Sequence, residues 1–228
     1  MLMAVVAQAS IVEDSFWDSH NWDNAAMELS VVKGKVTGSS EASNSFITSS
    51  HSIPGHPNNY SSLANVVRAS SNFSESTWED MTENASSIYS YDDFLKAVAK
   101  FPSFCGETMN PLGYNEDETC SREIAALFAH MTVTSDGLSK REDTADTSNF
   151  RARGPLGLKG EADYKAFSAV FYEGFDRSDE LFNEPERVAN DGYVGLAAAI
   201  WKYMTPSSPS PSMHSIMTGF YEPNAGDL

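Results

Sequence analysis

The sequence predicts a mainly α-helical domain that follows a Ser/Asn-rich extension. After Tyr89, apolar residues recur at intervals of three and four and helix-capping residues flank them, whereas no stretch shows the alternation of a half-buried strand. The first part of the chain, from Ser10 to Ser87, lacks sustained periodicity and contains the turn-rich run 52–59. We therefore divide the 228 residues into a poorly ordered extension or linker, 1–88, and a helical domain, 89–228. Within the extension, a short strand at 28–35 and a helix at 61–69 are local expectations.

The first helix of the domain is expected to follow Ser90, which can cap it, and to end at Pro102. A second helix over 121–131 carries a stripe of apolar residues that should face the core. The acidic stretch 115–118 before it could bind a divalent ion but lacks the glycine and alternating ligands of a calcium loop, so we expect an exposed loop there.

Three further helices are expected at 162–174, 192–204 and 212–217. The segment 192–204 is apolar on nearly all sides, which predicts a buried central helix. Its aromatic residues Trp201 and Tyr203 are therefore expected in the core rather than on a sugar-binding surface.

The charge of the chain restricts its partners. With 32 acidic and 15 basic residues the net charge is −17, which disfavours nucleic acids and anionic lipid surfaces. No apolar run reaches the roughly 20 residues that span a bilayer, so no membrane association is expected. No sequence pattern indicates a metal site or a cofactor.

Several features together favour a secreted, extracellular protein. The apolar residues 1–9 are either a remnant signal peptide or an accidental apolar terminus. Cys105 and Cys120 are close enough in sequence for one local disulfide, worth about 3 kcal/mol if it forms. Three Asn-x-Ser acceptors predict glycosylation at Asn59, Asn72 and Asn84.

Five sequence blocks occur in an order typical of one enzyme family. They are YSYDDFLKAVAKFPSFCGE (89–107), SREIAALFAHMT (121–132), GLSKRE (137–142), RGP (153–155) and AIWKYMTPSSPSPSMHSIMTGFYEPNAGD (199–227). Together they resemble the catalytic domain of family 19 glycoside hydrolases, the chitinases. The resemblance implies a bilobed, lysozyme-like α fold with a carbohydrate cleft, and single-step inverting hydrolysis of β-1,4-linked N-acetylglucosamine polymers.

Inverting hydrolysis needs one protonated and one ionised carboxyl group, about 6.5–9.5 Å apart. In the family, the helix matching 121–132 continues into His-Glu-Thr, where the glutamate is the general acid; the matching position here is Thr134. A threonine hydroxyl is too weak an acid for this role. In family members with a short loop the base lies nine residues further on, which corresponds to Asp143, beside Glu142.

The resemblance also identifies four altered or retained cleft positions. The glutamine that lines the family's cleft corresponds to Gly157, and the Ser/Thr that helps hold the attacking water corresponds to Lys159. The family's Asn-Tyr pair corresponds to Asp163 and Tyr164. The family also continues beyond the block that ends at Asp227, which leads us to expect a domain incomplete at its C-terminal end.

These changes favour a secreted chitinase-like pseudoenzyme that binds chitin or chito-oligosaccharides, or that serves as an extracellular structural module. An active endochitinase is the alternative, with Asp143 or Glu142 as the base and Asp136 as the acid. A third hypothesis is an acidic extracellular matrix protein, with other matrix components as partners and the Ser/Asn-rich segment as its working part.

Overall fold

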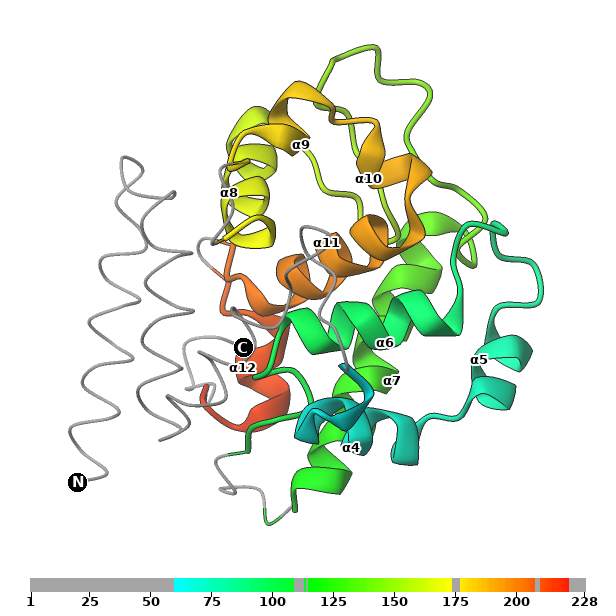
Figure 1. The fold of residues 1–228 in the computed structure, drawn as a ribbon, viewed down its shortest axis with the longest axis vertical. Helices are drawn as coiled ribbons and strands as arrows, with labels where there is room; N and C mark the ends of the chain where they lie inside the picture. The colour runs from blue at the N-terminus through cyan, green and yellow to red at the C-terminus, as the bar shows by residue number, and fades with distance from the viewer. Residues whose placement is uncertain (1–59, 109–112, 114, 174–176, 208–209, 222–228) are drawn as a thin grey trace, which may run out of the picture.

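A computed structural model describes residues 60–108, 113, 115–173, 177–207 and 210–221 (Figure 1). The expected signal remnant at 1–9, the strand at 28–35 and the acceptor Asn59 lie outside these residues. The elements in chain order are η1 (Tyr60–Ser62), α4 (Ala64–Asn72), α5 (Glu75–Met81), α6 (Tyr91–Lys100), α7 (Glu116–Ser135), α8 (Glu161–Phe171), α9 (Glu180–Asn183), α10 (Arg187–Asn190), α11 (Gly192–Met204) and α12 (Met213–Thr218). The described residues contain isolated β-bridges but no strand, which confirms the mainly helical fold class.

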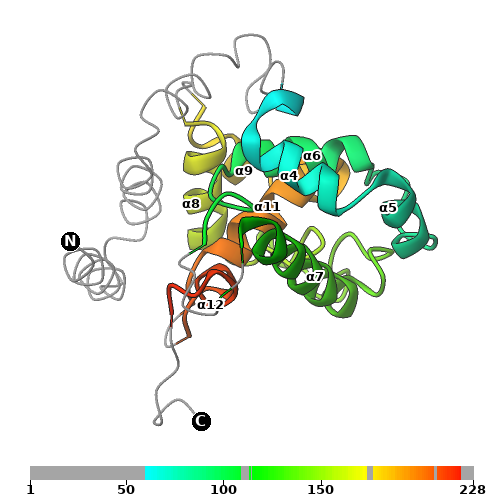
Figure 2. The same cartoon turned by 90° about the horizontal axis from the view of Figure 1, so that it is seen from below.

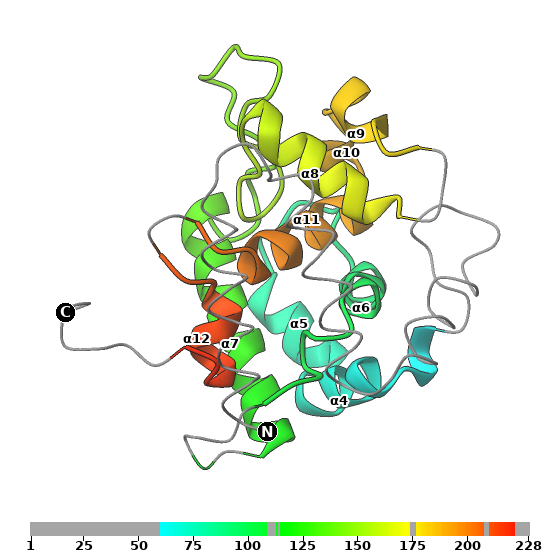
Figure 3. The ribbon, with the colours of Figure 1, turned by 90° about the vertical axis from the view of Figure 1, so that its left-hand side faces the viewer.

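Helix α11 is the central element of the fold. All but two of its residues are buried, and its bounds are those that the apolar pattern predicted. Figures 1 and 3 show α8, α9 and α10 on one side of α11, and α4, α5, α7 and α12 on the other. The expected core positions of Trp201 and Tyr203 are confirmed, since they are 6% and 0% exposed.

The folded body begins earlier than the expected boundary at Tyr89. Helices α4 and α5 bring Phe73 and Trp78 into a cluster of aromatic rings with Phe94 of α6 and Phe128 of α7. The centroids of Phe73 and Phe128 are 4.9 Å apart, and Trp78 stacks on Phe94 at 5.5 Å. Residues 60–88 are therefore part of the helical body, and assigning them to a poorly ordered extension was wrong.

Helix α7 also starts earlier than expected. Asn115 accepts a hydrogen bond from the backbone of Glu118, whose side chain accepts one from the backbone of Asn115, so the two residues form a capping box. Three acidic residues in the first turn favourably meet the positive end of the helix dipole. The segment 116–118 is thus the start of a helix, and the expectation of an exposed loop there was wrong.

Candidate functional site

Thr134 and Gly157 lie side by side although they are distant in the sequence. Thr134 is exposed in the last turn of α7, and a β-carbon placed on Gly157 would lie 3.5 Å from its Cγ2 atom. Gly157 has φ +64°, a left-handed conformation that a side chain would strain. The backbone at position 157 therefore favours glycine over the glutamine of the family pattern. As a result, residue 157 places no side chain on the surface beside Thr134.

Asp143 is attached to the same surface through the backbone. Its N–H group donates a 2.9 Å hydrogen bond to the carbonyl of Ala152, whose β-carbon would lie 3.6 Å from a β-carbon on Gly157. The exposed carboxylate of Asp143 accepts a 3.0 Å bond from the backbone of Ala145. The structure thus places Gly157 beside Thr134 and links Asp143 to the adjoining residue Ala152, whereas the family resemblance had identified Thr134, Gly157 and Asp143 separately.

The carboxylate of Glu142 forms ion pairs with two arginines. One oxygen, Oε2, accepts a 3.0 Å bond from Nε of Arg151 and a 3.2 Å bond from Nε of Arg153, and Arg153 is buried. Such charge-assisted contacts hold the side chain in place. Glu142 therefore fastens the loop that carries the other site positions, and a free base at this edge of the site is better provided by Asp143.

Tyr164 is buried beneath this loop. Its hydroxyl accepts a bond from Arg153 at 3.0 Å and donates one to the carbonyl of Arg151 at 3.1 Å. Burial raises the pKa of the phenol, and the nearby Arg153 opposes that rise. The contacts make Tyr164 a support of the site and leave little of its surface for a sugar.

Lys159 is directed to Asp146 at the surface. Its ammonium lies 3.0 Å from Oδ2 of Asp146, whose other oxygen, Oδ1, accepts a 2.8 Å bond from the backbone of Ser148. The bond from Ser148, together with Lys159, lowers the pKa of Asp146 to about 2. Lys159 thus makes an exposed ion pair in place of the hydroxyl that the family resemblance would put there.

Asp163 and Lys202 form the inner part of the site. The ammonium of Lys202, on α11, donates a 2.8 Å hydrogen bond to the carbonyl of Gly157. Burial raises the pKa of Asp163 and lowers that of Lys202, while the attraction between the two charges opposes both shifts. Sequence reasoning missed Lys202, although a lysine in an otherwise apolar helix is a signal that could have singled it out.

Asp136, the alternative acid, forms the C-cap of α7. It has φ 54°, and its exposed carboxylate lies 3.5 Å from the ammonium of Lys140. Both features direct this residue to solvent at the helix end.

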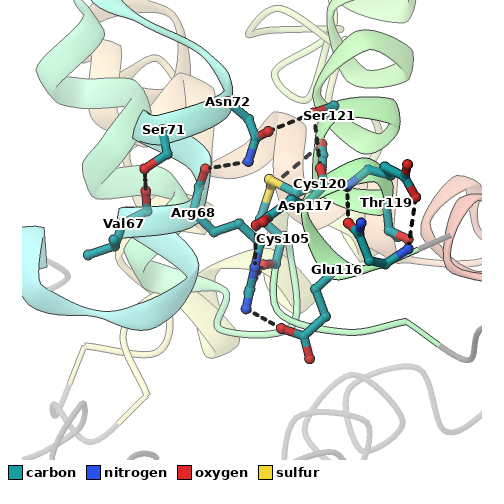
Figure 4. A network of polar contacts seen from close by, with 12 residues as sticks. Val67, Arg68, Ser71, Asn72, Cys105, Glu116, Asp117, Thr119, Cys120 and Ser121 are labelled. Atoms are coloured by element: carbon teal, nitrogen blue, oxygen red, sulfur yellow. Dashed lines mark hydrogen bonds and ion pairs between the residues drawn. A yellow bond between two sulfur atoms is a disulfide. The ribbon is translucent and has the colours of Figure 1, made fainter.

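The expected disulfide between Cys105 and Cys120 is present (Figure 4). Arg68 of α4 donates a 2.6 Å bond to the carbonyl of Cys105 and pairs with Glu116 and Asp117 in the first turn of α7. The disulfide loop is therefore bound to α4 as well as to α7.

The two acceptors for glycosylation within the described residues are both exposed. The side chain of Asn72 donates to the carbonyl of Arg68 at 2.9 Å and accepts a bond from Ser121 at 3.0 Å. Asn84 lies in the exposed turn that follows α5.

Among the described residues, no group of three His, Cys, Asp or Glu side chains is placed to hold a metal ion. Within the same residues, no helix is both long and apolar enough to cross a membrane.

Comparison with known proteins shows what this arrangement is similar to. The family model of class I chitinases, glycoside hydrolase family 19, matches residues 136–228. A crystal structure of a bacterial family 19 chitinase superposes with a TM-score of 0.53 at 22% identity, covering 65% of this chain and 76% of that one. The helical body is a family 19 chitinase-like domain.

Plant relatives of this chitinase-like domain include proteins named as endochitinases and proteins named as inactive chitinase-like proteins. An acidic endochitinase of Petunia hybrida is 31% identical over 153 residues, which is 61% of this chain and 55% of that protein. Inactive chitinase-like protein 2 of Hevea brasiliensis is 29% identical over 182 residues, which is 68% of this chain and 51% of that protein. The chain thus spans little more than half the length of either relative.

Proposed function

We propose that this chitinase-like domain is secreted and binds N-acetylglucosamine polymers without hydrolysing them. The observation that carries the proposal is the pairing of Thr134 with Gly157, because the acid position and the neighbouring cleft position have both lost their family side chains. A glycosidic oxygen must receive a proton as its bond breaks, and Thr134, at the position of the family's acid, has a hydroxyl group in place of a carboxyl group.

Asp136 is a poor replacement for the acid because it caps α7 and pairs with Lys140. A displacement of about 1 Å can cost a catalytic group a hundredfold in rate, so a carboxylate at the helix end does not substitute for one within the helix. The Hevea relative named as an inactive chitinase-like protein supports the same proposal.

The groups that remain suit recognition of an uncharged sugar. Asp143 offers exposed acceptor oxygens, and Asp163 and Lys202 offer a half-buried acceptor and donor beside Gly157. A small number of placed polar groups is typical of the way proteins orient a small-molecule ligand. Chitin or chito-oligosaccharides are therefore the partners that we propose.

The test is a hydrolysis assay on N-acetylglucosamine hexamer with wild type, Thr134→Glu and the uncharged control Thr134→Gln. We expect no cleavage by wild type or by Thr134→Gln and a measurable gain with Thr134→Glu, because a positioned general acid contributes about 10²–10⁴-fold. The gain should lie at the low end of that range, since Gly157 and Lys159 also differ from the family pattern.

Calorimetric titration of wild type with the same hexamer tests binding separately. Saturable binding without cleavage supports the proposal. Cleavage by wild type would overturn its non-catalytic part, and absence of binding would overturn its sugar-binding part.

A further inference from the structure

A second group of ionisable side chains lies buried outside the candidate site, where the disulfide loop, α7 and α12 meet. Glu123 of α7 and His214 of α12 are 0% and 1% exposed, and the side chain of Glu107 in the disulfide loop is 8% exposed. Nδ1 of His214 lies 2.6 Å from Oε1 of Glu123, and Nε2 lies 3.6 Å from Oε2 of Glu107. The imidazole therefore stands between two carboxylates.

The other oxygen of each carboxylate is held by the disulfide loop. Oε2 of Glu123 accepts a 2.9 Å bond from the backbone of Cys105, and Oε1 of Glu107 accepts a 2.5 Å bond from Ser103. These bonds fix the two carboxylates on either side of His214, independently of α12.

Among the described residues, two further ionisable groups lie near this cluster. Arg122, directly before Glu123 on α7, is exposed, and the phenol of Tyr203 on α11 is buried. Burial raises the pKa of Tyr203 first, and Glu123 adds to that rise. The ring of Phe220 stacks on that of His214, with centroids 6.4 Å apart.

The charge balance of this cluster favours a protonated histidine. With an imidazolium between them, the two carboxylates leave one net negative charge; with a neutral imidazole they leave two. Buried charge without a partner is costly, whereas an ion pair with good geometry and further hydrogen bonds offsets that cost. Loss of the proton from His214 therefore removes the favourable interaction and leaves two like charges close together.

Within the part of the chain that the structure describes, helix α12 buries little apolar surface. Its fully buried residues are His214 and Thr218, both polar, while Met213 and Met217 are only partly buried against the core. It lies beside α7 and α11, and Figure 2 shows it at the edge of the body. An element with so little buried apolar surface can open while the rest of the protein stays folded.

We propose that Glu107, His214 and Glu123 form a proton-controlled latch for α12. The helix stays docked while His214 is protonated, and it detaches on the alkaline side when His214 loses its proton, with α6, α7 and α11 remaining folded. This inference is independent of sugar binding.

Hydrogen–deuterium exchange of the full chain tests the latch, with rates corrected for the intrinsic effect of pH. Between about pH 6 and pH 9, a range that brackets the ordinary titration of histidine, we expect peptides from 212–221 to lose about tenfold or more of their protection. Peptides from α11 should keep theirs. Equal loss in both helices, or none in α12, would overturn the proposal.

Two variants and a matched control test whether His214 and Glu107 are the groups that cause the pH-dependent opening of α12. His214→Gln should expose α12 at every pH in this range and remove the transition, whereas the exposed His130→Gln on α7 should behave as wild type. Glu107→Gln, which removes one carboxylate, should move the transition to lower pH by about one unit. If His214→Gln fails to fold, the wild-type series and Glu107→Gln still decide; an unshifted transition in Glu107→Gln contradicts the latch.

Discussion

Gly192 has no side chain, and this allows the start of the central helix α11 to lie close to the chain before α6. It is the first residue of α11, and a β-carbon there would lie 1.9 Å from the carbonyl oxygen of Ile88 and 3.0 Å from Oδ2 of Asp93. The first of these atoms belongs to the backbone, so the segment before α6 would have to move. The close approach of the chain before α6 to the start of α11 therefore depends on this glycine.

We expect Gly192→Ala to lower the free energy of unfolding by about 3 kcal/mol, because overpacking against backbone is relieved only by moving an element. Gly137→Ala is the control: that position has φ +67° but open space around it, so only about 1 kcal/mol of backbone strain is expected. Urea denaturation measures both. A smaller loss for Gly192→Ala than for Gly137→Ala would contradict the steric argument.

The sequence identified several positions of the site but not how they meet. The family resemblance pointed to Thr134, Asp143 and Gly157, yet their proximity depends on how the loop 141–160 folds back through backbone hydrogen bonds. Lys202 is conspicuous as a lysine in an apolar helix, but its contact with the carbonyl of Gly157 could be found only from the structure. Glu142 could not be told from a free carboxylate until Arg151 and Arg153 were placed beside it.

At the scale of elements, α6 carries a charge that the fold disfavours. Lys100 is the last residue of α6, and its ammonium lies 5.8 Å from the centre of the Phe171 ring at the end of α8. Burial lowers the pKa of Lys100 to about 8, against the attraction of Glu173. Because the unfolded chain keeps the ordinary value of about 10.4, the folded state is penalised while Lys100 is charged.

The sign of the pH dependence follows from this difference. Below about pH 8 Lys100 is charged in both states and the full penalty applies; between about pH 8 and 10.4 the unfolded state binds more protons, so the contribution of Lys100 to stability improves as the pH rises. We expect Lys100→Met to raise the free energy of unfolding by about 1–3 kcal/mol at pH near 7, and by less as the pH approaches 10.

Denaturation at several pH values measures this, with the exposed Lys140→Met as the control that should show no such trend. A stability difference between wild type and Lys100→Met that stays constant over the pH range would contradict the assignment.

Helices were predictable where the signals that define them are local. The bounds of α11 follow from its continuous apolar surface between Asp191 and Thr205, and α6 follows from its cap at Ser90. The start of α7 was missed because the capping box depends on Asn115, which stands in an acidic run typical of a loop. Helices α4 and α5 were harder, because their short, polar sequences are held by tertiary contacts with the aromatic cluster.

At the scale of the whole molecule, α4 and α5 complete the core. Asn65 of α4 is buried, and its side chain donates to the carbonyl of Val98 at 2.8 Å, with the carbonyls of Phe101 and Phe104 at 3.3 Å. These bonds satisfy the end of α6, whose last carbonyls have no partner within the helix. Together with Phe73 and Trp78, this asparagine makes residues 60–88 part of the cooperative unit.

We therefore expect a chain that begins at Tyr60 to fold as the full chain does, and one that begins at Tyr89 to lose its cooperative thermal transition. Removing 60–88 strips Phe73 and Trp78 from the rings of Phe94 and Phe128 and uncovers the carbonyls that Asn65 satisfies. Truncating one buried aromatic side chain costs about 3–5 kcal/mol, so losing two consumes most of the 5–15 kcal/mol that stabilises a typical domain.

Circular dichroism during heating measures the transition, and Phe73→Ala with Trp78→Ala in the chain beginning at Tyr60 separates the aromatic contribution from the length of the chain. That double variant should melt far below its parent while keeping residues 60–88 in place. If instead the chain beginning at Tyr89 melts cooperatively at the temperature of the full chain, the boundary predicted from periodicity alone is the correct one, and α4 and α5 are an accessory to a body that is already complete.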